Sequence, residues 1–168
     1  MALLCKDTLS PCLPEHKKIW PKKEKYNRSS YYLADAEEFN VCSIDNEKWC
    51  KDSASPHADH VFLTCRNPSD AKKLAIIVEL KGNDVTHGCE QIIATVNAMK
   101  PYLQGYLVLA RLITTRTPKT TRQASVRNML VRLLKTYAQS VKARVREETL
   151  FNGSYKDSLK QLRTELGL

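Results

Sequence analysis

Glycine is scarce in this chain of 168 residues, with five scattered residues. Neither the phosphate-binding loop of nucleotide hydrolases nor the dinucleotide-binding fingerprint can be formed, because both need clustered glycines. No run of about 18 apolar residues occurs, so we expect no membrane-spanning segment. The first twelve residues lack the basic start and apolar stretch of a secretory signal. We therefore expect an intracellular protein, cytoplasmic or nuclear, whose six cysteines are reduced.

Acidic residues are absent from a long stretch of the C-terminal third. Ten Lys and Arg side chains lie between Arg111 and Arg146, without one Asp or Glu. The first 110 residues are neutral, with 14 basic and 14 acidic side chains, so the net charge of +9 belongs to residues 111–168. Such a concentration of positive charge is typical of proteins that bind a polyanion, with nucleic acid ahead of an anionic membrane. The alternative is a solvated basic helix face without a partner.

Paired metal-binding cysteines are missing as well. The chain has no Cys-x₂-Cys motif, and the His and Cys residues that the predicted topology brings together lack standard zinc-ligand spacing. These residues are His57, His60, Cys65, His87 and Cys89. A structural zinc site is therefore a minor alternative, and we predict that Cys65 and Cys89 are core residues rather than catalytic thiols.

The hydrophobic pattern predicts one domain behind a basic arm. The arm is residues 1–29, and the domain is residues 30–168, divided into a core (30–113) and a basic helical extension (114–168). Capping and spacing signals predict helices at about 30–39, 84–100, 121–150 and 154–166. Apolar runs predict strands at about 40–44, 60–65, 74–80 and 106–113. This order predicts an α/β sandwich in which helices flank a mixed sheet.

Charged residues interrupt the strand predicted at 74–80 at its very end. The strand is nearly all apolar, as in strands buried on both faces, yet Glu79 and Lys81 stand at its end. Because they are two residues apart on a strand, both side chains leave the same face, and that of Leu80 leaves the other. Residues that break a local rule in this way tend to be functional. The alternative is a structural ion pair at the sheet edge.

A hairpin would bring a second carboxylate to Glu79. Residues 67–70, Asn-Pro-Ser-Asp, favour a tight turn, and a hairpin centred there places Asp59 opposite residue 78 or 79. Close carboxylates repel each other unless one is protonated or a cation lies between them.

Mg²⁺ prefers oxygen ligands of this kind. We therefore predict that Asp59, Glu79 and the carbonyl of Leu80 bind Mg²⁺ or Mn²⁺. The metal would activate water and balance charge during attack on a phosphodiester. Lys81 would orient or activate that water, or stabilise the developing charge.

These motifs resemble those of the PD-(D/E)xK nuclease superfamily, the fold of many restriction endonucleases and Holliday junction resolvases. The resemblance rests on Pro56-His-Ala-Asp59, on Ile76-Ile-Val-Glu79-Leu-Lys81-Gly82, and on the α-β-β-β-α-β order over about residues 30–113. In one departure from the family pattern, the proline lies three residues before the aspartate instead of next to it.

The resemblance implies a restriction-endonuclease-like core with Asp59 and Glu79 as metal ligands and Lys81 as the catalytic lysine. It further implies an active-site Gln91 on the following helix, and in some members of the superfamily a Glu from the first helix, here Glu37 or Glu38, completes the metal site. We therefore predict a Mg²⁺-dependent endonuclease acting on DNA, of restriction, resolvase or phage-defence type. The alternatives are an inactive nucleic-acid-binding module on the same fold and an RNA-directed endonuclease.

The predicted phosphate contacts lie at the start of the last long helix and in the loop before it: Arg116, Lys119, Arg122 and Arg127. We expect a homodimer, because cutting two strands with one site per chain is easiest with two chains. A membrane-surface or partner-docking protein using the helix at 121–150 is a further alternative. Its apolar stripe is broad, however, which favours packing on the sheet over lying on lipid, so no membrane contact is expected.

Overall fold

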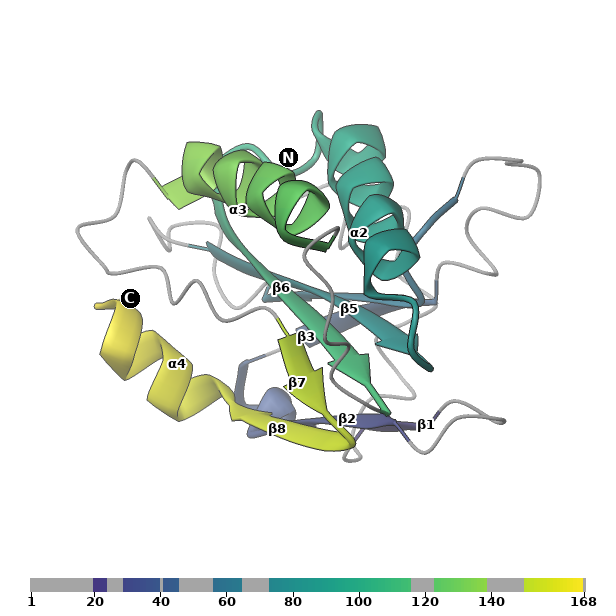
Figure 1. Cartoon of the computed structure of the whole chain (residues 1–168). Coiled ribbons are helices and arrows are strands. Elements are labelled where there is room, and N and C mark those ends of the chain that lie inside the picture. The colour runs from purple at the N-terminus through teal and green to yellow at the C-terminus, as the bar shows by residue number, and fades with distance from the viewer. Residues whose placement is uncertain are drawn as a thin grey trace.

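A computed structural model describes residues 20–23, 29–39, 41–45, 56–64, 73–115, 123–138 and 150–167. Within this part the chain forms a five-stranded sheet, a three-stranded sheet and three α-helices (Figure 1). The predicted α/β class with a mixed sheet flanked by helices is confirmed. None of the helices in these ranges combines the length and the apolar character needed to cross a membrane.

The larger sheet contains the apolar runs of the sequence. Its strands, in spatial order, are β3 (Val41–Asp45), β4 (His60–Thr64), β5 (Lys73–Lys81), β6 (Tyr106–Thr114) and β7 (Leu150–Asn152). The first three pair antiparallel, whereas β6 runs parallel to β5 and to β7. A parallel pair needs a crossover connection, and α2 (Val85–Met99) provides it between β5 and β6. The predicted succession of three strands, a helix and a strand is therefore present.

The pairing of β4 with β5 sets the geometry of the candidate site. His60 pairs with Val78 and Val61 with Ile77, so the same register continues to Asp59 opposite Glu79. This is one of the two registers expected from a turn at 67–70, and the turn itself lies outside the described residues.

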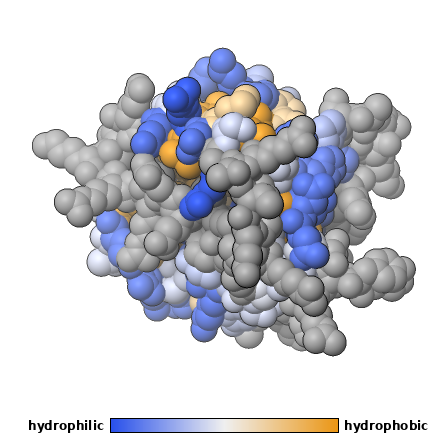
Figure 2. All heavy atoms as spheres, in the orientation of Figure 1, coloured by the Kyte–Doolittle hydropathy of each residue, from blue (hydrophilic) through white to orange (hydrophobic). Residues whose placement is uncertain are grey.

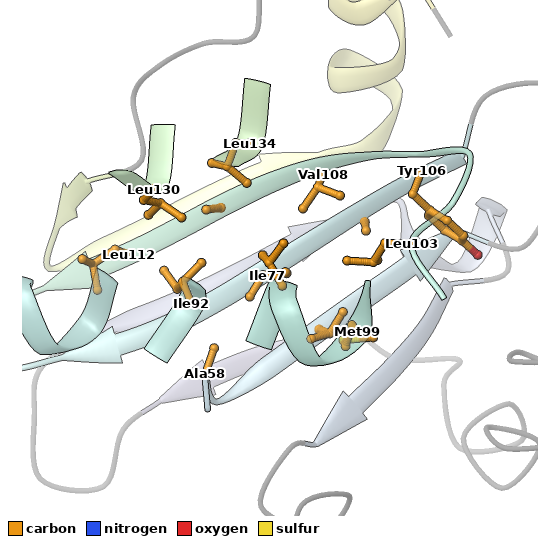
Figure 3. Packing of buried hydrophobic residues seen from close by; sticks show 14 of the residues in the cluster. Ala58, Ile77, Ile92, Met99, Leu103, Tyr106, Val108, Leu112, Leu130 and Leu134 are labelled. Atoms are coloured by element: carbon orange, nitrogen blue, oxygen red, sulfur yellow. The ribbon is translucent and has the colours of Figure 1, made fainter. Parts of the chain in front are cut away.

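Two helices cover one face of the larger sheet, α2 and α3 (Gln123–Ala138). The residues packed between them and the sheet include Ile77, Ile92, Leu112 and Leu130, which point toward one another in Figure 3. Met129 of α3 is 59% exposed. It lies one position before Leu130 and therefore on a different side of the helix. Figure 2 shows hydrophobic residues gathered over α3 and α2, with hydrophilic ones beside them.

The opposite face is covered by a second, smaller sheet and a helix. Its strands are β1 (Trp20–Lys23), β2 (Ser30–Ala34) and β8 (Ser154–Ser158), in the order β1-β2-β8, and α4 (Leu159–Leu166) follows β8. The 3₁₀-helix η3 (Ala36–Phe39) lies between β2 and β3. The apolar side chains of this layer pack on the large sheet as a second core cluster that contains Leu80.

The structure corrects two helix predictions in this layer. Residues 30–34 are a strand, and only 36–39 are helical. Tyr31 and Leu33 are buried while their neighbours are not, which is the period of a strand rather than that of a helix. Residues 154–158 are likewise a strand, and the helix begins at Leu159. Each strand supplies hydrogen-bonding partners for the other, since β2 and β8 pair in parallel.

Two further boundaries differ from the predictions. The helix expected at 121–150 is described from Gln123 to Ala138, and Leu150 belongs to β7 rather than to a helix. Residues 139–149 lie outside the described ranges. Of the arm expected at 1–29, residues 20–23 form β1, which pairs antiparallel with β2.

Candidate functional site

Two hydrogen bonds join Asp59 to the end of β5, one donated by its backbone and one accepted by its side chain. The backbone N–H of Asp59 donates to Glu79 Oε2 at 3.0 Å, and the backbone N–H of Leu80 donates to Asp59 Oδ2 at 2.8 Å. Asp59 immediately precedes β4, so its side chain accepts a bond from β5 just beyond the described strand ladder. The two carboxylates are therefore held close together by main-chain groups of the hairpin.

Glu79 is completely buried, and this changes its protonation. Burial, and after it the negative charge of Asp59, together raise the pKa of the Glu79 carboxyl to about 8. The hydrogen bond and charge of Lys81 and the Asp59 N–H act in the opposite direction, but do not offset burial. The Glu79 carboxyl therefore holds a proton more strongly than an exposed glutamate does.

Lys81 lies next to Glu79, nearer to solvent than the buried carboxyl. Its ammonium nitrogen Nζ is 2.8 Å from Glu79 Oε1, and its side chain is 21% exposed. The backbone after Lys81 is held in place because Gly82 O accepts hydrogen bonds from both the N–H and the hydroxyl of Thr115, each at 2.9 Å. As predicted from the strand period, Lys81 and Glu79 share the face of β5 that α2 covers, while Leu80 packs in the second core cluster.

Gly88 of α2 makes room for Lys81. A Cβ atom at Gly88 would lie 3.2 Å from Lys81 Cγ and 2.6 Å from Leu112 Cδ1, closer than packed carbon atoms approach. The helix can therefore lie directly on the aliphatic part of Lys81 and on β6 only because this position lacks a side chain. Sequence reasoning missed this role, although a glycine inside a predicted helix is a signal for close packing.

Gln91 lies on α2, where the resemblance implies an active-site glutamine. Its amide Nε2 donates to the carbonyl of His57 at 2.8 Å, so this side chain binds the main chain just before Asp59. One turn further along the helix, the hydroxyl of Thr95 accepts from the N–H of Ala58 at 2.7 Å. Thr95 was not expected from the sequence, although its spacing of four from Gln91 places both on one helix face.

The acidic residues expected from the first helix do not supply a visible ligand. Glu38 is exposed, and its Oε1 lies 2.7 Å from Lys160 Nζ of α4, which belongs to the layer on the other face of the sheet. Glu38 therefore lies away from Asp59 and Glu79, because the segment before it is a strand of that second layer. The side chain of Glu37 lies outside what the structure describes.

Of the four predicted phosphate contacts, only Arg127 falls in the described residues. It lies on α3, and its charge opposes the rise that burial causes in the pKa of Cys89, which reaches about 11. Arg127 is therefore near the middle of α2. Arg116, Lys119 and Arg122 lie outside the described ranges. Arg111, one of the ten basic residues of the charged stretch, is buried and bound to Asp157, so it adds nothing to a basic surface.

The described residues among the candidate zinc ligands do not form one group. His60 lies beside Phe62, with ring centroids 6.1 Å apart, and Phe62 belongs to the second core cluster. Cys89 is buried in the first cluster, on the other face of the sheet, as predicted for a core residue. Cys65 lies outside the described residues, and among those described no three His, Cys, Asp or Glu side chains gather as a metal-binding group.

No family model, curated protein or solved structure matches this chain. Its function is therefore inferred from the geometry of the site and the chemistry of its residues. The described residues bring together Asp59, Glu79 and Lys81 directly, with Gln91 bound to the segment that leads into Asp59. This arrangement can hold a divalent cation, place the positive charge of Lys81 beside an anionic group, or bind and release a proton at Glu79.

Proposed function

We propose that this protein is a Mg²⁺-dependent nuclease of the PD-(D/E)xK type that hydrolyses DNA phosphodiester bonds. The observation that carries the proposal is the pair of hydrogen bonds that join Asp59 to Glu79 and to Leu80, beside the ammonium of Lys81. Two acids and one lysine at the end of a buried strand are hard to explain as a structural device. A structural ion pair would need one acid, and the second raises the electrostatic cost.

The residues of the site fit a magnesium ion. Mg²⁺ is bound in proteins through one or two carboxylates while it keeps several waters, so Asp59 and Glu79 suffice as charged ligands. The Leu80 N–H points at Asp59, and in a strand the carbonyl of a residue points to the same side as its N–H. Asp59, Glu79 and the Leu80 carbonyl would therefore hold the ion. Bound there, it would lower the pKa of a water and neutralise charge on the phosphate.

Lys81 has the position required of the third active-site group. Its ammonium is bonded to Glu79, and its side chain is partly exposed to solvent. The aliphatic part of that side chain packs against Gly88 of α2. A cation fixed in this way can orient the attacking water or stabilise the negative charge that develops on the phosphate. Glu79 thus has two roles, as a metal ligand and as the partner that keeps Lys81 inside the site.

The order of the elements supports a restriction-endonuclease-like core. Three antiparallel strands, a crossover helix and a parallel strand follow one another as β3-β4-β5-α2-β6, with the acids on β5 and just before β4. The core differs from the expected pattern in its first element, where β2 and η3 replace a helix. The proposed site depends only on the part of the order that is present.

The choice of nucleic acid as the substrate rests on charge. The net charge of +9 lies in residues 111–168, which include α3 next to α2. Phosphates attract such a surface, and the neutral first 110 residues provide the acids that a cation needs. We propose DNA, cut by a homodimer that brings one site to each strand.

A cleavage assay tests this proposal. Wild-type protein is incubated with duplex, branched and single-stranded DNA and with RNA, with and without Mg²⁺. We expect cutting of DNA with Mg²⁺, and loss of cutting in Glu79→Gln and Lys81→Met with DNA affinity kept. The matched control is Glu90→Gln, since Glu90 is an exposed acid on α2 paired with His87 rather than with the site.

Each other outcome points to a named alternative. Normal cutting by both site variants would remove Glu79 and Lys81 from the mechanism. Binding of DNA by a wild-type protein that cuts nothing would indicate an inactive nucleic-acid-binding module. Cutting of RNA alone would indicate an RNA-directed endonuclease.

A further inference from the structure

One peptide unit next to the candidate site is bound at both of its polar atoms by side chains of α2. The carbonyl of His57 and the N–H of Ala58 belong to the same peptide group. Gln91 Nε2 donates to that carbonyl at 2.8 Å, and Thr95 Oγ1 accepts from that N–H at 2.7 Å. The two side chains are four residues apart, so they lie one above the other on the same face of the helix.

Because this peptide group is buried, its N–H needs a partner within the protein. Ala58 is fully buried and Thr95 nearly so, and water is therefore unable to replace the hydroxyl as the partner of the Ala58 N–H. The Thr95 hydroxyl also donates to the carbonyl of Gln91 at 2.9 Å, which orients its lone pairs toward Ala58. A threonine inside a helix is usually neutral or unfavourable for helix stability, and here its hydroxyl makes a contact that an apolar side chain could not make.

The bound peptide leads directly into Asp59. Asp59 N–H donates to Glu79 and the Asp59 carboxylate accepts from Leu80, so three consecutive groups of this segment are held by α2 and β5. A carboxylate that must meet a cation needs a defined backbone, because side-chain rotation alone would leave its oxygens out of position. The contacts of α2 define that backbone on the side that β5 does not reach.

We propose that Gln91 and Thr95 are positioning residues that clamp the His57–Ala58 peptide and thereby set the orientation of the Asp59 carboxylate toward Glu79. The idea rests on the proposed function for its catalytic consequence, but its structural consequence is independent of any activity. Gln91 is then distinct from a catalytic residue, since it acts on Asp59 through the main chain. Thr95 becomes as important as Gln91, although the family resemblance does not point to it.

Hydrogen exchange of single amides tests the clamp without reference to activity. Thr95→Val removes the hydroxyl and preserves the shape of the side chain. We expect the Ala58 and Leu80 amides to exchange at least about tenfold faster, because one loses its acceptor and the other depends on the placement of Asp59. Thr95→Ser, which keeps the hydroxyl, restores slow exchange. Thr164→Val is the control, because Thr164 makes the same bond to the carbonyl four residues before it, but on an exposed face of α4.

Kinetics measured on the same variants give the catalytic consequence. For Thr95→Val we expect kcat to fall about 10- to 100-fold with KM for DNA unchanged, as for groups that orient metal ligands, and Thr95→Ser to recover most of the loss. Unchanged exchange at Leu80 in Thr95→Val would overturn the clamp. Faster exchange with an unchanged kcat would also overturn it as a positioning device. If wild-type protein cuts no nucleic acid, the proposed function fails, and the exchange at Leu80 still decides whether α2 positions Asp59.

Discussion

Two buried ion pairs lie on opposite faces of the same sheet, and they differ in how their charges are matched. On one face, Arg111 Nε donates to Asp157 Oδ2 at 2.7 Å and a second guanidinium nitrogen donates to Oδ1 at 3.2 Å. The hydroxyl of Tyr31 adds a bond to Oδ2 at 2.8 Å. Both charged side chains are at most 4% exposed. One cation meets one anion, and both oxygens of the acid are bonded.

On the other face, two carboxylates lie close together, and one of them, that of Glu79, is bonded to a lysine. Glu79 is buried beside Asp59, and the only cation bound to it in the described structure, Lys81, is partly exposed. The matched pair joins β6 to β8 and, through Tyr31, to β2. Burial alone would lower the pKa of Arg111, but Asp157, with smaller contributions from Tyr31 and Tyr155, outweighs it and the pKa is raised. The excess acid of the other site is what a cation would neutralise. This difference is the one we expect between a structural ion pair and a site that binds a cation.

Removing the acid of the matched pair should give the largest change in stability. We expect Asp157→Asn to lower the free energy of unfolding by about 3–5 kcal/mol, because Arg111 is left as a buried charge without a counter-ion. Asp59→Asn makes the same chemical change in the mismatched pair and should cost far less, since the amide oxygen can still accept from the Leu80 N–H and no buried cation loses its partner. Urea unfolding at pH 7 measures both. Equal losses in the two variants would contradict the distinction.

The pH dependence of stability should come from the mismatched site. Because the pKa of Glu79 is about 8 in the folded chain and 4.5 is its ordinary value, the folded state binds more protons between these values. The free energy of unfolding of the metal-free chain therefore falls as pH rises through this window, by up to about 1.4 kcal/mol per pH unit. Below pH 4.5 this contribution is fully present.

Glu79→Gln should flatten that slope, whereas Asp157→Leu should leave it unchanged while lowering stability at every pH. Urea unfolding between pH 5 and 8 gives the slopes. A slope in Glu79→Gln as steep as in the wild type would show that another group titrates.

Close packing around Lys81 predicts a smaller effect. Gly88→Ala should lower the free energy of unfolding by about 1–3 kcal/mol, since the new methyl group would overlap Leu112 and press on Lys81. Combining it with Leu112→Val, which removes the closest atom, should recover part of the loss. Thermal unfolding of the single and double variants measures this. A Gly88→Ala variant as stable as the wild type would show that α2 can shift away from β5 and β6 without cost.

The smallest expected effect concerns the basic face. Arg127→Ala should flatten the dependence of log affinity for DNA on log salt by about one unit of slope, as expected for the loss of one phosphate contact. Arg163→Ala serves as the control, since Arg163 lies over the ring of Phe39 in the layer on the other face of the sheet. Fluorescence anisotropy over a salt series supplies the slopes. Identical slopes in the two variants would remove Arg127 from the DNA contact.

The parts of the site that the sequence predicted correctly depend on local pattern. Strand period places Glu79 and Lys81 on one face, and one of the two registers expected from residues 67–70 is the one that brings Asp59 to Glu79. Both rules act over at most about twenty residues. Both predictions hold because β5 is buried along nearly its whole length, so its position in the sheet is fixed by its apolar side chains.

The parts that could not be predicted depend on contacts between distant segments. Tyr31 and Asp157 are 126 residues apart, and their bond accompanies the parallel pairing that makes both of their segments strands. Read locally, residues 30–39 have the serine cap of a helix, and tertiary pairing overrides that preference. The role of Thr95 likewise depends on how α2 packs against the segment before β4.

The rate of DNA cleavage as a function of Mg²⁺ concentration tests the central claim most directly, when wild type, Asp59→Asn and Asp157→Asn are compared at a temperature where all are folded. We predict Mg²⁺-dependent cutting by wild type and by Asp157→Asn, and none above background by Asp59→Asn. Cutting by Asp59→Asn at the wild-type rate, or by the wild type equally well in excess chelator, would contradict the assignment of the Asp59–Glu79 pair as the metal-binding catalytic site.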